Sequence, residues 1–265
     1  MQLCCFTVAT IDYLDRAIVL INSFSHNSGL LYIFMLYLIN VPLDIATEKT
    51  RSLPNTSVQH IDVDLKDEQL RCYSSCVRAV CCSRLLAQYK YIFYFDADTI
   101  IRKDLSELYN IMICNDISLN YLYEIVGERK VKCKNRNKNI CNNDNVDKLD
   151  GGKKRKHKYK TGVMTFNSNP SSISYVNEWT KKLFGCEANL NATDINHGLT
   201  INQNKWYDDQ NFFKKTVQEF ADKIKVGNLA REYIDWKHLD SGKIWVGKGE
   251  RKNKSMFLRE SAKYL

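Results

Sequence analysis

The stretch "YIFYFDADTIIRKDL", residues 91–105, opens with a run of apolar and aromatic side chains that ends at two aspartates, Asp96 and Asp98. Residues 91–95 are too few and too rich in β-favouring side chains for a helix, so we predict a strand covered on both faces, as in a parallel sheet. Carboxylates inside such a strand would be costly to bury unless they were paired or bound to a cation. At its carboxyl end, Asp96 and Asp98 would open into the crevice where α/β sheets bind ligands. The alternative is that Asp98 caps a turn and Asp96 merely ends the strand.

Strands and helices alternate on both sides of this stretch. Residues 12–24 carry an apolar stripe at helical spacing, and residues 66–89 form a long helix that leads into the strand. Asn169 and Pro170 are typical of an N-cap and the first position of a later helix. Further strands are expected at residues 3–10, 30–39, 58–65 and 161–167. The alternation predicts an α/β fold, a three-layer sandwich around one mostly parallel mixed sheet.

The positive charge of the chain is concentrated in one segment. The formal net charge of the 265 residues is +9, but residues 129–160 hold 13 Lys or Arg and 3 Asp, and the remainder carries 26 basic and 27 acidic residues. We predict a single domain over residues 1–265 with a disordered insertion at 129–160, because this Asn/Lys-rich segment cannot build a core. The segment is either a tether to anionic surfaces or a solvated loop. The neutral body argues against nucleic acid as a partner.

The cysteines and the apolar runs bear on the compartment. The chain has ten cysteines but no C-x-x-C spacing, which weakens a structural zinc site. We expect free, mostly buried thiols in a reducing compartment. The longest apolar run, residues 30–39, is too short to span a bilayer. The N-terminus has no basic leader or cleavage pattern. These features predict a cytoplasmic protein without a transmembrane segment.

Four motifs, in order, resemble family-eight glycosyltransferases of the glycogenin and galactosyltransferase type, which have the A-type fold. "TVATIDYLDRAIVLINSF" (7–24) looks like their first strand and helix, and "LLAQYKYIFYFDADTIIRKDLSELY" (85–109) is similar to their D-x-D segment. "TGVMTFN" (161–167) resembles their strand "sGvmvfn", and "YDDQNFF" (207–213) their Asp-Gln turn. The resemblance implies a nucleotide-diphospho-sugar transferase fold. It also implies a glycosyltransferase, of the hexosyltransferase class, that uses a nucleoside-diphosphate sugar, expected to be a UDP-sugar, with retention of configuration.

The resemblance assigns the D-x-D pair to a metal. A divalent ion, Mn²⁺ or Mg²⁺, can neutralise the charge that develops on the departing diphosphate, and hard oxygen ligands suit such ions. By resemblance, Asp98 contacts the metal most directly, and Asp96 binds the ribose side, the metal, or both. Ala97 is small, which lets the backbone approach the nucleotide. In relatives a histidine supplies a third ligand, for which His238 is the candidate; otherwise the site has no imidazole.

Further donor contacts are implied along the chain. Thr10 and Tyr13 follow the first strand, where relatives hold the nucleotide base; Tyr13 would stack on a uracil-like ring, or belong to the helix core. Arg78 lies near the position where relatives place a Lys or Arg over the phosphates, or it is an exposed helix arginine. Asp209 and Gln210 match the pair that faces the donor sugar, close to the reacting carbon in retaining enzymes, and are the candidate catalytic residues. The alternative for this pair is a polar helix N-terminus with an Asp cap.

The segment "KHLDSGKIWVGKGERK" (237–252) departs most from the family pattern. One frame aligns His238 with Gly242 and Lys243, with the spacing one residue off. A second frame places Gly247 and Lys248 at the phosphates. In both frames the glycines and lysines suit a flexible lid that grips phosphate.

Two other functions compete with this one. In haloacid-dehalogenase phosphatases a D-x-D motif supplies the nucleophile, here Asp96, and Asp208 with Asp209 would be the metal-binding pair. That motif normally ends the first strand of its fold, whereas several elements precede it here, and Ile100 stands where Thr or Val is expected. A non-catalytic, transferase-like basic binding module rests on the insertion alone. The acceptor, whether a glycan, a protein or a small molecule, is not specified by the sequence.

Overall fold

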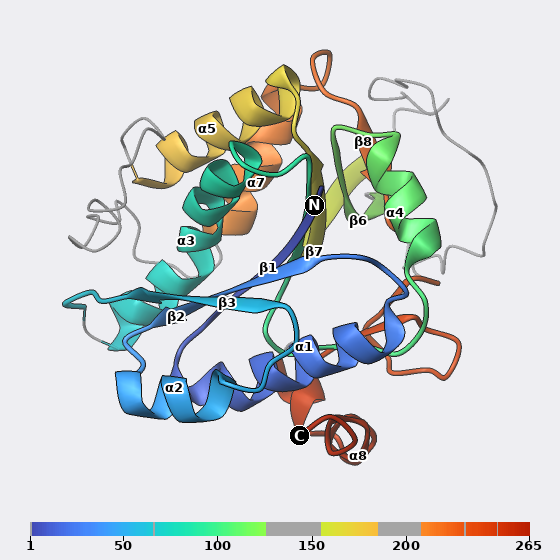
Figure 1. Ribbon diagram of the computed structural model, residues 1–265. Coiled ribbons are helices and arrows are strands. Elements are labelled where there is room, and N and C mark those ends of the chain that lie inside the picture. The colour runs from blue at the N-terminus through green and yellow to red at the C-terminus, as the bar shows by residue number, and fades with distance from the viewer. Residues whose placement is uncertain (1, 66, 126–154, 185–207, 231, 248) are drawn as a thin grey trace.

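The chain folds around a central sheet with helices on both faces (Figure 1). The structure is a computed structural model, and it describes residues 2–65, 67–125, 155–184, 208–230, 232–247 and 249–265. The sheet has seven strands in the order β3-β2-β1-β4-β7-β6-β8. These strands are β1 (Leu3–Ala9), β2 (Ile33–Ile39), β3 (Thr56–Ile61), β4 (Tyr91–Phe95), β6 (Ile117–Ile125), β7 (Arg155–Asn167) and β8 (Val226–Asn228). The three-layer α/β sandwich predicted from the sequence is confirmed.

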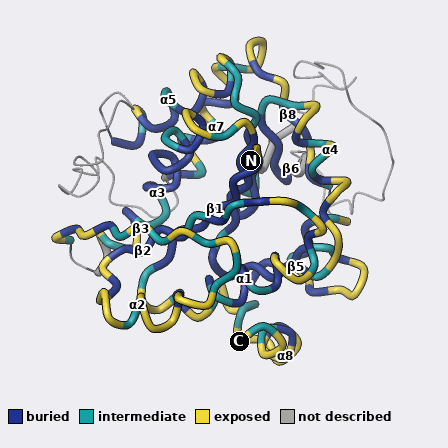
Figure 2. Tube along the Cα trace, in the orientation of Figure 1, coloured by how far each residue is buried: buried dark blue, intermediate teal, exposed yellow. Residues whose placement is uncertain are grey.

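The strands nearest the centre are buried because both of their faces are covered. Strand β1 pairs in parallel with β2 and β4, and β2 pairs in parallel with β3. Every residue of β1 and β4 is buried, which confirms the strand predicted at 91–95. Strand β7 runs antiparallel to both β4 and β6, so the sheet is mixed. Figure 2 shows the buried trace of β1 through the middle of the molecule and exposed residues along the outer helix α2.

Each face of the sheet has its own apolar core. On one face lie α3 (Asp67–Leu86), α5 (Pro170–Phe184) and α7 (Asp208–Glu219), whose Tyr73, Trp179 and Phe213 are fully buried. On the other face lie α1 (Leu14–Asn27), α2 (Leu43–Thr50) and α4 (Ser106–Ile113). The aromatic residues of this second core include Phe24 and Phe95, with ring centroids 5.6 Å apart.

A small second sheet carries the C-terminal part of the chain back to the D-x-D segment. Strand β10 (Ile244–Val246) lies between β5 (Thr99–Ile101), with which it is antiparallel, and β9 (Ile234–Asp235). The 3-10 helix η2 (Gly249–Asn253) and helix α8 (Ser255–Ser261) follow β10. Helix α8 lies below α1 in Figure 1, beside the C-terminus. Strand β5 follows the two aspartates directly, so β10 approaches them from a distant part of the sequence.

The helix signal at Asn169 is confirmed in detail. The side-chain Oδ1 of Asn169 accepts a hydrogen bond of 2.9 Å from the backbone N–H of Ser172, as an N-cap does, and α5 begins at Pro170.

The predicted insertion, in contrast, ends too late in the sequence. Residues 129–154 lie outside the described residues, but residues 155–160 form the first part of β7, with Arg155 opposite Ile125 of β6. The prediction that the insertion reaches residue 160 is therefore wrong, because backbone pairing can order a stretch whose composition lacks an apolar pattern.

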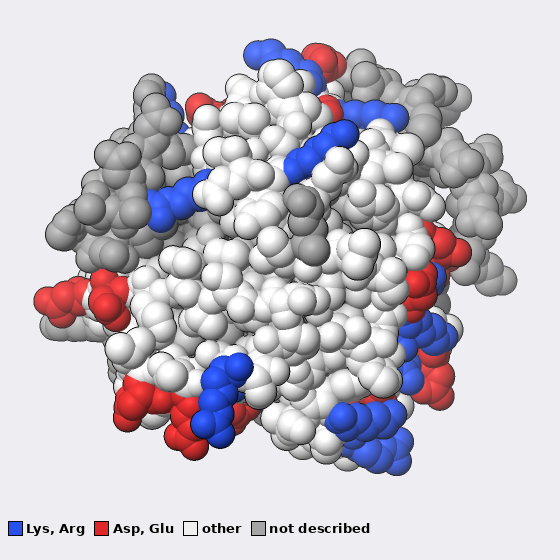
Figure 3. Space-filling view, in the orientation of Figure 1, with Lys and Arg blue, Asp and Glu red and all other residues white. Residues whose placement is uncertain are grey.

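The composition also led to expectations about the thiols, about membrane-spanning helices and about the distribution of surface charge. None of the seven cysteines within the described residues forms a disulfide, and all except the exposed Cys114 are buried, as predicted for that part of the chain. Among the helices that the structure describes, none has the length and hydrophobicity to cross a bilayer. On the face shown in Figure 3, the described Lys and Arg side chains are interspersed with Asp and Glu and do not merge into one basic stripe.

Candidate active site

The D-x-D segment lies at the carboxyl end of β4, where the sheet opens. The backbone N–H of Asp96 donates to the carbonyl of Gly162 on β7 over 2.7 Å, which fixes the turn between β4 and β5. Asp98 is only 7% exposed, and Ala97 between the two aspartates is also buried. Burial, followed by the carboxylate of Asp96, raises the pKa of Asp98 to about 6, although Lys252 and Arg16 act in the opposite direction. Burial is thus the main cause of the shift, and the neighbouring carboxylate adds to it.

The two carboxylates of this segment fit a divalent cation. They offer hard oxygen ligands of the kind that Mn²⁺ and Mg²⁺ prefer, and a bound cation would offset both the cost of burial and the repulsion from Asp96 that raise the pKa of Asp98. Within the described residues, no three His, Cys, Asp or Glu side chains are grouped so that they could hold a metal ion.

His238 lies behind the D-x-D segment and already has a partner. The ring is buried, and its Nε2 lies 3.0 Å from the carbonyl oxygen of Val246, so Nε2 carries the donated proton. Among the residues that the structure describes, its buried Nδ1 has no hydrogen-bond partner, and burial lowers the pKa of the imidazole. Trp245 and Phe257 pack against the ring at centroid distances of 5.2 and 5.0 Å. In this arrangement His238 supports β10, and its role as third metal ligand stays a prediction.

Arg78 joins the D-x-D segment to the Asp-Gln pair. Its side chain is 5% exposed; Nη1 lies 3.2 Å from Oδ1 of Asp96, and Nη2 forms an ion pair with Asp209. Thr161 accepts two further hydrogen bonds from the guanidinium, at its carbonyl (3.0 Å) and at its hydroxyl (2.9 Å). Burial alone would lower the pKa of Arg78, but Tyr94 and Asp96 raise it above its ordinary value. The alternative of an exposed helix arginine is wrong.

The consequence of this contact is that two distant motifs share one buried cation. Asp209 lies in the first turn of α7, its side chain is 2% exposed, and its backbone carbonyl accepts a hydrogen bond of 3.4 Å from the indole of Trp179. Asp96, which is 23% exposed, also accepts a hydrogen bond of 2.8 Å from the hydroxyl of Tyr94. Gln210, next to Asp209, is partly exposed. The two motifs that the sequence placed more than a hundred residues apart therefore meet at Arg78.

Gly162 on β7 explains how Asp96 can lie so close to the neighbouring strand. A side-chain Cβ at this position would lie 2.7 Å from Oδ2 of Asp96 and 3.1 Å from the indole of Trp236, so a larger residue would displace the carboxylate. The Trp236 ring is in turn flanked by the ammonium of Lys160, 4.8 Å from its centroid, and by the guanidinium of Arg251, at 5.8 Å. Cations thus surround the acidic centre.

Tyr13 lies at the carboxyl end of β1, beside the D-x-D segment. It ends the 3-10 helix η1 (Ile11–Tyr13), and its N–H donates to the carbonyl of Thr10 over 2.9 Å. Two cations face its ring: Arg16 at 5.1 Å and Lys252 at 4.4 Å from the centroid. The sequence analysis missed Arg16 and Lys252. The only available signal for Arg16 was its position one helical turn after Tyr13. Lys252 ends the segment that the sequence assigned to the phosphates, but nothing in that segment distinguished this lysine from the others.

The two C-terminal frames involve residues at opposite ends of β10. Lys243 lies at the far end of β10, where its ammonium pairs with Glu107 at 3.0 Å and its carbonyl accepts from the N–H of Arg102. Gly247 lies at the near end, and its N–H donates to the carbonyl of Asp98 over 2.7 Å. Lys248 is outside the described residues. Gly247 therefore lies beside the aspartates and Lys243 does not, and the assignment of either frame to the phosphates stays a prediction.

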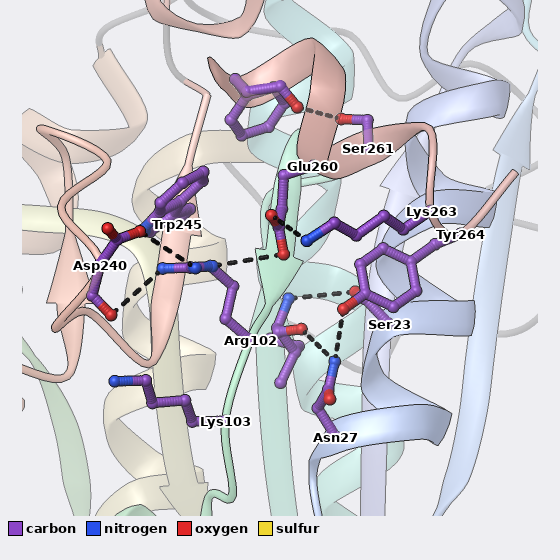
Figure 4. Close-up of polar contacts among 12 residues, drawn as sticks. Ser23, Asn27, Arg102, Lys103, Asp240, Trp245, Glu260, Ser261, Lys263 and Tyr264 are labelled. Carbon is purple, nitrogen blue, oxygen red and sulfur yellow. Dashed lines mark hydrogen bonds and ion pairs between the residues drawn. The ribbon is translucent and has the colours of Figure 1, made fainter.

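A polar cluster anchors the C-terminal segment to β5 and α1 (Figure 4). Arg102 pairs with Glu260 of α8 and with Asp240, each at 3.4 Å, and its guanidinium stacks 3.9 Å from the ring of Trp245. The amide of Asn27 donates to the hydroxyl of Tyr264 and to the carbonyl of Ile101, both over 2.8 Å. Helix α8 is therefore fixed to the strand that leaves the D-x-D segment.

A comparison with protein-family models matches residues 4–211 to "Glycosyl transferase family 8". The chain belongs to glycosyl transferase family 8. A search of curated proteins found no match. The family assignment supports a glycosyltransferase over the phosphatase and binding-module alternatives.

Solved structures of glycosyltransferases share the fold of this family-8 chain. The galactosyltransferase LgtC, solved with donor and acceptor sugar analogues, aligns with a TM-score of 0.56 at 10% identity, covering 98% of this chain and 96% of LgtC. Mouse xyloside xylosyltransferase 1 aligns with a TM-score of 0.51 at 14% identity, covering 95% and 99% of the two chains. The bifunctional glycosyltransferase WbbM aligns with a TM-score of 0.53 at 13% identity over 99% of this chain, which spans 50% of WbbM.

Proposed function

We propose that this protein transfers a sugar from a nucleoside-diphosphate sugar, a UDP-sugar, to a glycan, protein or small-molecule acceptor, with a divalent metal and with retention of configuration. The observation that carries the proposal is the pair of aspartates at the end of β4 in a family-8 chain, with Asp98 buried and its pKa raised to about 6. Two carboxylates at one edge of the sheet offer oxygen ligands to a metal, and a diphosphate would supply further oxygen ligands.

The acidic residues would hold the metal, Mn²⁺ or Mg²⁺, which when bound acts as a Lewis acid on the departing diphosphate. Asp98 is the principal ligand in this proposal, and Asp96 contributes one oxygen while the other stays with Arg78 and Tyr94. Arg78 is a positioning residue: it fixes Asp96 and Asp209 relative to each other from a buried position. Because Asp209 is held by this ion pair, it orients the site, and Gln210 is the member of the pair that faces the donor sugar.

The nucleotide would lie along the edge formed by the ends of β1 and β4. Thr10 and Tyr13 lie at the end of β1, where the base would bind, and the ring of Tyr13 offers a stacking surface. Gly247 and Lys248 would meet the diphosphate, an assignment supported by the hydrogen bond between Gly247 and the carbonyl of Asp98. A Cβ on Gly247 would lie 3.0 Å from that carbonyl oxygen, so glycine permits this close approach.

A thermal-shift panel of nucleotide sugars, with and without Mn²⁺, tests the proposal. A ligand at about 100 Kd should add roughly 2.7 kcal/mol to the free energy of unfolding, which is about 5 °C in Tm for a chain of this size. We expect the shift with a UDP-sugar and Mn²⁺ together, slow release of free sugar from that donor, and loss of both in Asp98→Asn. Release of phosphate from simple phosphate esters, with no response to any nucleotide sugar, would refute the proposal.

A further inference from the structure

Lys252 covers the aromatic ring that the proposed function assigns to the nucleotide base. It lies in η2, beyond the part of the chain matched to the family, and it is partly buried. Its Nζ donates a hydrogen bond of 2.5 Å to the hydroxyl of Tyr13 and lies 4.4 Å from the centroid of the ring. A base that stacked on this side of Tyr13 would have to displace the ammonium.

The same lysine lies next to the acidic centre. A Cβ at Gly247 would lie 2.8 Å from Cβ of Lys252 and 3.0 Å from the carbonyl oxygen of Asp98, so the two residues flank one glycine. Lys252 and Arg16 are the cations whose charges oppose the rise in the pKa of Asp98. In the protein without a donor, Lys252 is therefore part of the positive charge that stabilises the buried carboxylate.

The backbone that carries Lys252 is anchored on both sides. Before it, Gly247 is bound to the carbonyl of Asp98, and after it, α8 is fixed by the ion pair between Glu260 and Arg102. Phe257 of α8 is buried against His238. A lysine side chain has a flexible four-carbon stem and three donors, so the ammonium can change partner while the backbone stays in place.

We infer that Lys252 is a diphosphate-binding residue. In the donor-free protein its ammonium lies on the ring of Tyr13. When the nucleotide base stacks on that ring, the ammonium is displaced and binds the diphosphate. The identity of the ligand rests on the proposed function; the assignment of Lys252 does not come from the family motif. The base and the ammonium compete for one face of Tyr13, and only a ligand with a diphosphate offers the displaced ammonium a new anionic partner. A nucleoside without phosphates displaces Lys252 and offers it no new partner. The exchange thus favours nucleoside diphosphates over nucleosides.

Calorimetric titration of the full chain with UDP and with uridine, both with Mn²⁺, tests this exchange. Lys252→Met keeps most of the apolar stem and removes the charge, and we expect it to weaken UDP binding about tenfold or more, the range for one charge-assisted hydrogen bond. Uridine should bind to this variant as well as or better than to the wild type. Lys254→Met, an exposed lysine two residues further on, is the matched control and should leave the ratio of UDP to uridine affinity unchanged.

Tyr13→Phe provides a second, milder variant, because it keeps the stacking ring and removes only the acceptor oxygen. Freed from that hydrogen bond, Lys252 should allow uridine to bind more tightly, whereas a hydroxyl that served the nucleotide directly would make binding weaker. If wild type binds UDP and Lys252→Met leaves the ratio of UDP to uridine affinity within twofold of wild type, the inference alone is refuted. If wild type binds neither UDP nor a UDP-sugar with Mn²⁺, the proposed function is refuted together with it.

Discussion

Replacing Arg78 by methionine should separate the structural and the functional parts of the site. Methionine has a length and volume close to those of the arginine stem, so the helix α3 and its packing are retained, but the charge and the planar fork are lost. Two carboxylates, Asp96 and Asp209, would then lie side by side without their shared cation. The hydrogen bonds to Thr161 would be lost as well.

The size of the effect follows from burial. Arg78 and Asp209 are 5% and 2% exposed, so the pair counts as buried, and removing one partner of such a pair destabilises a protein by about 3–5 kcal/mol. Asp96 is 23% exposed and water screens part of its charge, so the lower half of this range is the better expectation. Because unfolding entropy is about 2.1 cal/mol/K per residue, 3–4 kcal/mol lowers the Tm of 265 residues by about 5–7 °C.

Thermal denaturation of three variants at pH 7, without metal, measures this loss. Arg78→Met should fall by the stated amount, and Arg78→Lys by less, since it keeps the charge but cannot reach both carboxylates and Thr161 together. In the Arg78→Met background, Asp209→Asn should recover part of the loss, because it removes one of the two uncompensated charges. If Arg78→Met melts within 1 °C of wild type, or if the double variant recovers nothing, the buried ion-pair account is wrong; a change of 1 °C is roughly sevenfold smaller than the upper expectation.

Three further experiments test the acidic centre, the alignment of the C-terminal segment with the family pattern, and the segment between β6 and β7. Asp98→Asn should raise the Tm of the metal-free protein at pH 7. The pKa of Asp98 in the folded protein is about 6, above its ordinary value of 3.8, so wild type loses up to about 3 kcal/mol of stability as the pH rises through this window. A pH series of melting curves should show no such loss in the variant. Lys248→Ala should weaken UDP binding more than uridine binding, whereas Lys243→Ala should alter neither, because its ammonium already pairs with a glutamate; equal effects in a titration would discard the frame chosen here. Replacing residues 126–154 by Asn-Gly should leave Tm and UDP affinity nearly unchanged, since the flanking residues are directly opposite each other in β6 and β7; insoluble expression would show that this segment is needed for folding.

The sequence was sufficient for the elements whose patterns are local. The buried strand at 91–95, the helix at 67–86 and the N-cap at Asn169 each have a signal within a few residues, and each is present in the structure. Strand β6 was not predicted as an element, because it mixes polar and apolar residues. Helix α7 was considered only as the alternative for the Asp209–Gln210 pair, because the family pattern indicated a turn at its polar first residues.

The parts of the site that escaped prediction depend on long-range packing. Arg78 has no sequence feature that distinguishes a buried arginine from an exposed one, because its burial depends on Asp209, 131 positions later in the printed sequence. The same holds for Lys252, which reaches Tyr13 across 239 positions. His238 looked like a ligand by its residue type, whereas the structure places its Nε2 on the carbonyl of Val246. Residue type and spacing indicated the kind of chemistry, and only the packing showed which side chains already have a hydrogen-bond or ion-pair partner.

The pairing of β5 with β10 also has a consequence for the order of events at the ribosome. The side chain of Arg102 contacts the carbonyl of Asp240, which lies 138 positions later. At a synthesis rate of about 5–20 residues per second, the nascent chain would wait about 7–28 s between the two. During that interval the strand that follows the two aspartates has no partner on that side, and the carbonyl of Asp98 has not yet met the N–H of Gly247. The turn that carries the aspartates is therefore completed only after the parallel half of the sheet has had time to form.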